Sequence, residues 1–194
     1  MKKLTFLFAV LLIVSISNAQ ITFECEYDTI QAPNVVWLIA IGDNYYRYFV
    51  RDNDNYQFKL YNLNHSLEKT ISYPAVSGFP NHYLSSLTDS YDVPSAFITQ
   101  SLFNTDNLIE FVIIYRDSSF CKEKLRIYNE IGSILLEIDS SSSFYIASAG
   151  NNVYKLIVFK TTSCPYKFLG TQIYSLPGTL PAGKTEIIGQ TDRW

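Results

Sequence analysis

Two histidines are the only imidazole groups in this chain of 194 residues, and neither lies in a pattern typical of catalysis. His65 stands between Asn64 and Ser66 in a short polar turn, where histidine tolerates the positive φ that such turns require. His82 lies in a proline-rich stretch, where an exposed loop histidine is the simpler interpretation. No serine sits in the Gly-x-Ser-x-Gly pattern of a hydrolase nucleophile. The sequence therefore predicts no catalytic residue.

The run Asp52-Asn53-Asp54-Asn55 carries the oxygen ligands that calcium prefers. A calcium loop of the EF-hand type needs glycine at its sixth position and glutamate at its twelfth, and these positions hold Gln57 and Leu63. A hairpin turn explains the run without an ion. A pair of carboxylates for glycoside cleavage stays open, because the separation of such a pair is spatial. We expect no metal and no cofactor.

Three cysteines predict one disulfide and one unpaired thiol, if the chain is exported. Cys121 and Cys164 both fall in polar connections between predicted strands, so they can pair if the two hairpins are neighbours. Three unpaired thiols are the alternative. The chain has no Cys-x-x-Cys pair or Cys/His cluster that would indicate zinc.

The N-terminus is typical of a cleavable signal peptide, residues 1–19. Lys2 and Lys3 precede an apolar run, and Ser17 and Ala19 supply the small residues read by a signal peptidase. The run is shorter than a membrane span, so we expect a mature chain from Gln20 with no membrane span, secreted, periplasmic or on the cell surface. That chain has 13 basic and 18 acidic residues, which argues against nucleic-acid binding.

A short motif repeats three times: an apolar residue, tyrosine, Asn or Ser, two variable residues, Gly or His, then Ser or Thr and an apolar residue. It predicts the end of a strand, a tight turn and a return strand, with Gly or His at positive φ. The tyrosine and turn residues of the three copies are Tyr61 with His65, Tyr128 with Gly132, and Tyr174 with Gly178.

The residues before each motif also repeat. Residues 45–51, 108–116 and 153–160 are rich in aromatic and β-branched residues, and each is followed by a polar connection and another strand. Residues 111–114 and 156–159 are continuously apolar, which predicts strands buried on both faces.

Each repeat is therefore predicted to be an antiparallel β-meander. Residues 35–41 and 144–149 are candidates for a fourth strand in the first and third repeats. The motif tyrosines are 46 residues apart in the second interval and 67 in the first, which places an insertion at about residues 74–100, with a short helix at 82–90. We expect an all-β domain over residues 20–180, three blade-like repeats in an open or partial propeller, and a polar tail over 181–194. A β-sandwich or barrel is the alternative.

The form Ile173-Tyr174-Ser175-Leu176-Pro177-Gly178-Thr179-Leu180 resembles the propeller-like β-repeats of secreted cargo of the type IX secretion route. The resemblance covers residues 37–180 and implies secretion and a β-repeat fold, but no activity. Such cargo usually carries a C-terminal β-sandwich sorting domain, which is not found here after Leu180. The chain is thus expected to be truncated or to use a simpler route.

Export, an aromatic β-scaffold and the lack of catalytic motifs favour a non-enzymatic binding or surface-interaction module for a protein or glycan. A secreted hydrolase with an acidic pair among the loop aspartates is the first alternative. A fragment of a larger secreted propeller is the second.

Overall fold

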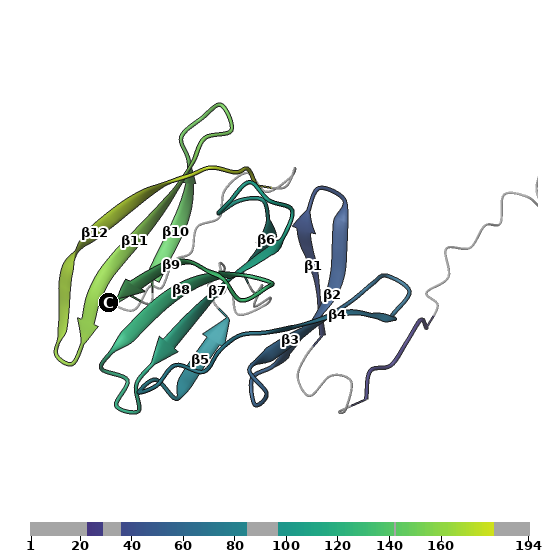
Figure 1. Cartoon of the computed structure of the whole chain (residues 1–194), viewed down its shortest axis with the longest axis horizontal. Helices are drawn as coiled ribbons and strands as arrows, with labels where there is room; N and C mark the ends of the chain where they lie inside the picture. Colours follow the sequence, from purple (N-terminus) through teal and green to yellow (C-terminus); the bar gives the residue numbers. More distant parts are fainter. Residues whose placement is uncertain (1–22, 29–35, 85–96, 142, 181–194) are drawn as a thin grey trace, which may run out of the picture.

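The computed structural model describes residues 23–28, 36–84, 97–141 and 143–180. The predicted signal peptide and the predicted polar tail lie outside these residues. Within them the chain is entirely β, with no helix, and its strands form three antiparallel sheets in chain order (Figure 1). The predicted all-β class with antiparallel meander sheets is confirmed.

The first sheet is a meander of four strands in the order β1-β2-β3-β4. In the second sheet, β5 and β6 both pair with β7, which is followed by β8 and β9, and the third sheet has the order β10-β11-β12. The strands are β1 Val36–Gly42, β2 Tyr45–Asp52, β3 Gln57–Tyr61, β4 Leu67–Ser72, β5 Asn81–Leu84, β6 Ile98–Gln100, β7 Ile109–Arg116, β8 Glu123–Asn129, β9 Ile134–Asp139, β10 Ser143–Ser148, β11 Tyr154–Ser163 and β12 Tyr166–Leu176.

The second sheet lies between the other two, and its central strand β7 is buried on both faces, as predicted. Side chains alternate along a strand, so Phe111 and Ile113 pack toward the first sheet while Val112 and Ile114 pack toward the third. Two hydrophobic cores result, one at each junction between sheets.

The third sheet differs from its prediction. Residues 156–159 alternate between buried and partly exposed instead of being buried throughout. Leu156 and Val158 face the second sheet, whereas Ile157 and Phe159 point to the opposite face. That face is not covered by another sheet within the described residues, so a continuously apolar sequence here does not mean burial on both sides.

The insertion contains the two short strands β5 and β6, which lie end to end along one edge of β7. The predicted helix over residues 82–90 is wrong at its start, because residues 81–84 pair with residues 113–116 as a strand. The remainder of that prediction lies outside the described residues.

The first two repeat motifs form the predicted turns. His65 and Gly132 have φ of 67° and 85°, and their amides donate to the carbonyls of Asn62 and Asn129. The prediction for Gly178 is wrong, because this residue is not among those with positive φ. Its amide donates instead to the carbonyl of Leu102, so the chain after β12 crosses to the loop between β6 and β7.

Across these described ranges, we find no helical segment with the length and hydrophobicity needed to cross a bilayer.

Candidate functional site

A small apolar groove lies at the junction of the second and third sheets, between their outer strands β9 and β12. Its volume is about 130 Å³. Seven of its lining side chains are apolar or aromatic and one is a serine: Phe103, Ile127, Leu135, Leu136, Leu156, Tyr174, Leu176 and Ser175. Ile127 and Leu156 of this lining are buried, and the partly buried residues packed on the second core, such as Leu136 and Tyr174, are the ones that reach the surface.

Strand alternation explains why these residues meet. Leu136 is paired with Ile127 across β8 and β9, and Tyr174 is paired with Leu156 across β11 and β12. All four side chains point to the junction between the two sheets, because residues paired across antiparallel strands share one face. Leu135 joins them at the irregular register beside the second turn.

The polar groups of the lining already hold hydrogen bonds. The hydroxyl of Tyr174 donates to Gln172 Oε1 at 3.0 Å, and the ammonium of Lys155 donates to Ser175 Oγ at 2.7 Å. Among the described residues, no carboxylate or imidazole lines the groove. The side chains of the lining are therefore suited mainly to apolar contact.

The volume limits what can enter. Pockets for drug-sized ligands are about 300–1,000 Å³, whereas a cavity of about 150 Å³ accommodates a benzene ring. A groove of about 130 Å³ thus has room for one large aliphatic or aromatic side chain.

Cys121 and Cys164 form a disulfide across the same pair of sheets, with their Cα atoms 5.0 Å apart. Cys121 lies in the connection between β7 and β8, and Cys164 lies between β11 and β12. The bond therefore links two neighbouring hairpins, and Cys25 is the exposed free cysteine.

His65 binds the segment of residues 23–28 to the first sheet. The Tyr27 hydroxyl donates to its Nδ1 at 3.0 Å, and its Nε2 donates to the Glu24 carboxylate at 3.3 Å. The ring stacks on Tyr48 at 4.8 Å, and burial raises the pKa of Tyr27 to about 12. The motif residue Tyr61 packs against Tyr27 in the same cluster. This second role of His65, beyond the turn, was not predicted.

His82 is packed at the junction of the first two sheets rather than exposed in a loop. Its ring stacks on Tyr56 at 4.0 Å, and its Nε2 donates to the carbonyl of Asn53 at 3.1 Å. Tyr73 packs edge-on against it, and burial raises the pKa of the Tyr73 hydroxyl. These contacts give His82 a structural role in joining the β2–β3 hairpin to the insertion.

The acidic run at Asp52 forms the hairpin turn between β2 and β3. The Asp52 carboxylate accepts hydrogen bonds from Asn55 and Gln57 at 2.8–3.0 Å. Burial opposes its ionisation, but these donors hold the pKa of Asp52 below its usual value. Within the described part of the chain, no group of three His, Cys, Asp or Glu residues is placed to hold a metal ion.

Sequence reasoning missed the groove. Its residues come from four strands and a loop, and each was recognisable only as a member of a buried face. Tyr174 had been singled out for its place in the repeat motif, and the same alternation that buries it also places it in the groove.

The chain matches no known protein family, no curated protein and no solved structure.

Proposed function

We propose that this protein is an exported, non-enzymatic binding module that holds an apolar side chain of a protein partner in the groove between β9 and β12. The observation that carries the proposal is the groove itself: an opening beside the second core whose lining residues are seven apolar or aromatic residues and one serine. Export rests on the signal-peptide pattern of residues 1–19.

A protein is favoured over a glycan by the chemistry of the lining. Sugars are held by hydrogen bonds to several polar groups, whereas Tyr174 and Ser175 already hold bonds to Gln172 and Lys155. A protein partner also gains from the strands that flank the groove. β9 and β12 are the outer strands of their sheets, so each has one edge without a strand partner within the described residues. An extended segment can pair with such an edge while its side chain enters the groove.

The test is selection of peptides from a displayed random library on the purified chain from Gln20 to Trp194, with a glycan array and a panel of hydrolase substrates run in parallel. We expect selected peptides with a shared leucine, isoleucine or phenylalanine. Leu135→Asp, in the groove, should weaken their binding at least about tenfold, since the apolar contact is lost.

Leu63→Asp is the matched control, because Leu63 is an exposed leucine in the turn after β3 of the first sheet. It should leave peptide binding unchanged. Binding only to glycans, peptide binding unaffected by Leu135→Asp, or substrate turnover abolished by replacing a loop aspartate would each overturn the proposal.

A further inference from the structure

The three repeats place equivalent residues on equivalent faces of their sheets. In the first two motifs, the apolar residue before the tyrosine faces the sheet that follows in the chain, and in all three the tyrosine lies on the opposite face of its strand. Leu60 of the first sheet packs against the second, and Ile127 of the second packs against the third. Ile173 of the third sheet holds the same position.

The burial of these three residues differs sharply. Leu60 is 0% exposed and Ile127 is 1% exposed, whereas Ile173 is 66% exposed. Their cross-strand partners follow the same order: Phe49 and Val112 are fully buried, and Ile157 is only partly buried. The outward face of the third sheet thus repeats a surface that the two earlier repeats cover with the next sheet.

One row of this face is apolar, and it is flanked on β12 by Thr171 and Ser175. Tyr145, Ile157 and Ile173 lie side by side in one row across β10, β11 and β12, and Phe159 packs beside Tyr145. Exposed Phe168 lies further along β12. An exposed row of this kind on a sheet is typical of an interaction surface.

The other end of the molecule carries a second exposed apolar surface, on the first sheet. The segment of residues 23–28 and β12 lie at opposite ends of the molecule (Figure 1). Leu38 is 56% exposed, and it lies on the face of β1 that points away from the second sheet, since its neighbours Trp37 and Ile39 belong to the first core. Phe23 and Tyr46 are also exposed at this end.

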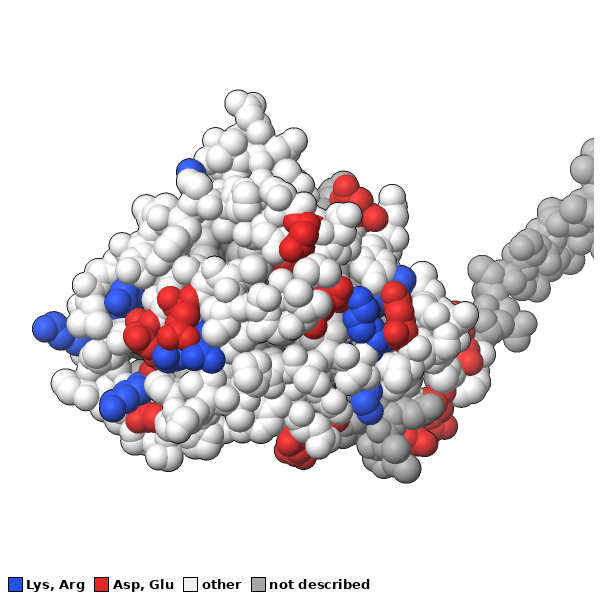
Figure 2. Space-filling model, in the orientation of Figure 1, with Lys and Arg blue, Asp and Glu red and all other residues white. Residues whose placement is uncertain are grey.

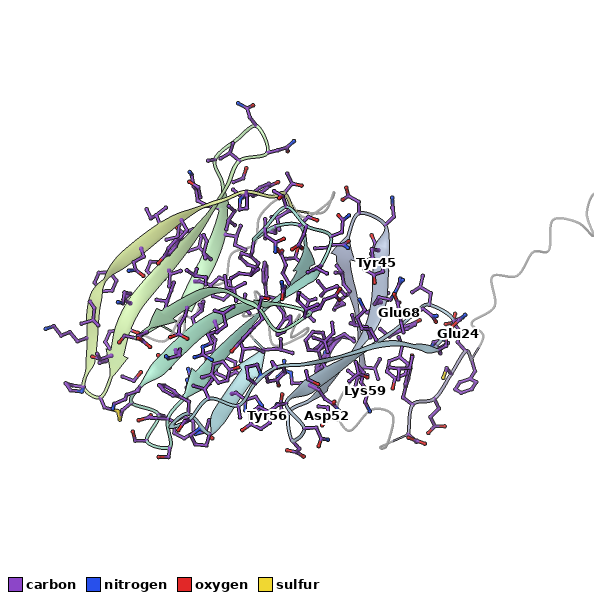
Figure 3. All side chains as sticks on the ribbon, viewed as in Figure 1. Glu24, Tyr45, Asp52, Tyr56, Lys59 and Glu68 are labelled. Atoms are coloured by element: carbon purple, nitrogen blue, oxygen red, sulfur yellow. A yellow bond between two sulfur atoms is a disulfide. The ribbon has the colours of Figure 1, made fainter. Side chains whose placement is uncertain are left out.

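The third sheet and the segment of residues 23–28 carry opposite charge. The third sheet, from Ser143 to Leu176, contains three lysines and no acidic residue, and Lys155 lies on its outward face, two residues from Ile157 in β11. The segment of residues 23–28 contains Glu24, Glu26 and Asp28 and no basic residue. Figure 2 shows basic and acidic side chains in both halves of this face, with a basic side chain at the extreme left, and Glu24 is labelled at the right-hand end in Figure 3.

We propose that the outward face of the third sheet docks onto the first-sheet end of a second copy of this chain, so that copies associate head to tail. Charge complementarity selects this arrangement. Two third-sheet faces placed against each other would bring Lys155 toward Lys155, whereas a head-to-tail contact brings Lys155 toward the carboxylates of residues 23–28. The contact would also continue the stacking order already built into the chain, with Ile173 covered as Leu60 and Ile127 are.

The expected contact is modest in size. Three strands span about 14 Å, and the 11 residues of β12 extend about 36 Å. A contact of these dimensions has an area at the small end of the range for stable interfaces, so we expect a dissociation constant in the micromolar rather than the nanomolar range. A head-to-tail contact closes into a ring or extends into a filament. A ring of two copies would contain six sheets, a number within the range of closed propellers.

The test is sedimentation equilibrium of the purified protein over ~1 µM to ~1 mM, at low and high salt. We expect self-association that weakens as salt rises, because the ends attract by opposite charge. Ile173→Glu, at the third sheet, and Leu38→Glu, at the first, should each weaken it by about 10- to 100-fold. Ile131→Glu is the matched control, since Ile131 is 71% exposed in the turn between β8 and β9 of the second sheet, and it should have no effect.

Mixing the two single variants distinguishes a head-to-tail contact from a contact between two like ends. Ile173→Glu retains an intact first-sheet end and Leu38→Glu retains an intact third-sheet face, so the mixture should form heterodimers that neither variant forms alone. Circular dichroism of each variant checks that its fold is retained. A monomer at every concentration, association unaffected by Ile173→Glu, or association weakened by Ile173→Glu but not by Leu38→Glu would each overturn the proposal.

Discussion

Replacing both Cys121 and Cys164 with alanine should destabilise the protein by about 4 kcal/mol. The disulfide joins residues 43 apart in the chain, and closing a loop of this length restricts the unfolded chain by about that free energy at 25 °C. Small domains have a total stability of about 5–15 kcal/mol, so the loss is a large part of the whole. The native contacts of the two hairpins remain in the variant, and we therefore expect it to fold.

The assay is urea unfolding followed by circular dichroism, with and without reductant. Wild-type protein in reductant should resemble the double variant, and the double variant itself should not respond to reductant. Cys25→Ala is the control, because Cys25 is exposed and free, and it should unfold like wild type. Amide hydrogen exchange should speed up most in β10–β12, because the bond ties this sheet to the second. A double variant within about 1 kcal/mol of wild type would refute the reasoning.

Three further changes test single contacts. His82→Ala should cost about 1–3 kcal/mol in urea unfolding, because it removes the stack on Tyr56 and the hydrogen bond to Asn53, and a variant as stable as wild type would contradict this. Gly178→Ala should destabilise by about 2 kcal/mol or more, since the new Cβ would lie 1.6 Å from the Ser101 carbonyl oxygen, and an unchanged melting temperature would be contrary to the expectation. Asp52→Asn should be less stable than wild type at neutral pH. The pKa of Asp52 is lower in the folded than in the unfolded protein, so its carboxylate adds to the free energy of unfolding at every pH above the usual pKa of 3.8. This contribution is lost as the pH falls through the lower pKa of the folded state. The urea unfolding curves of wild type and Asp52→Asn should therefore converge in acid.

Much of the fold could be predicted from the sequence because period-2 alternation and turn residues are local signals. Residues 45–51 and 108–116 were recognised as strands within a residue or two of β2 and β7. The positive φ of His65 and Gly132 follows from the same local chemistry.

Two of the errors share a physical origin, because the place of a residue in the stack of sheets is not encoded in its local sequence. Residues 156–159 are as apolar as residues 111–114, but β7 lies between two sheets and β11 lies at the end of the stack. Gly178 resembles a turn glycine, yet its lack of a side chain serves the close approach to Ser101.

The groove could not be predicted for a related reason. The sequence identifies Leu136 and Tyr174 only as apolar positions in alternating strands. Only the packing of the second sheet on the third places them beside each other at the surface.

Binding in the groove is tested most directly by amide hydrogen exchange of the protein with and without a peptide selected on it. We expect slower exchange in β9, Ile134–Asp139, and β12, Tyr166–Leu176, with β1 and β4 unchanged. Slower exchange centred on the first sheet, or no change in β9 and β12 at saturating peptide, would contradict a binding site between the second and third sheets.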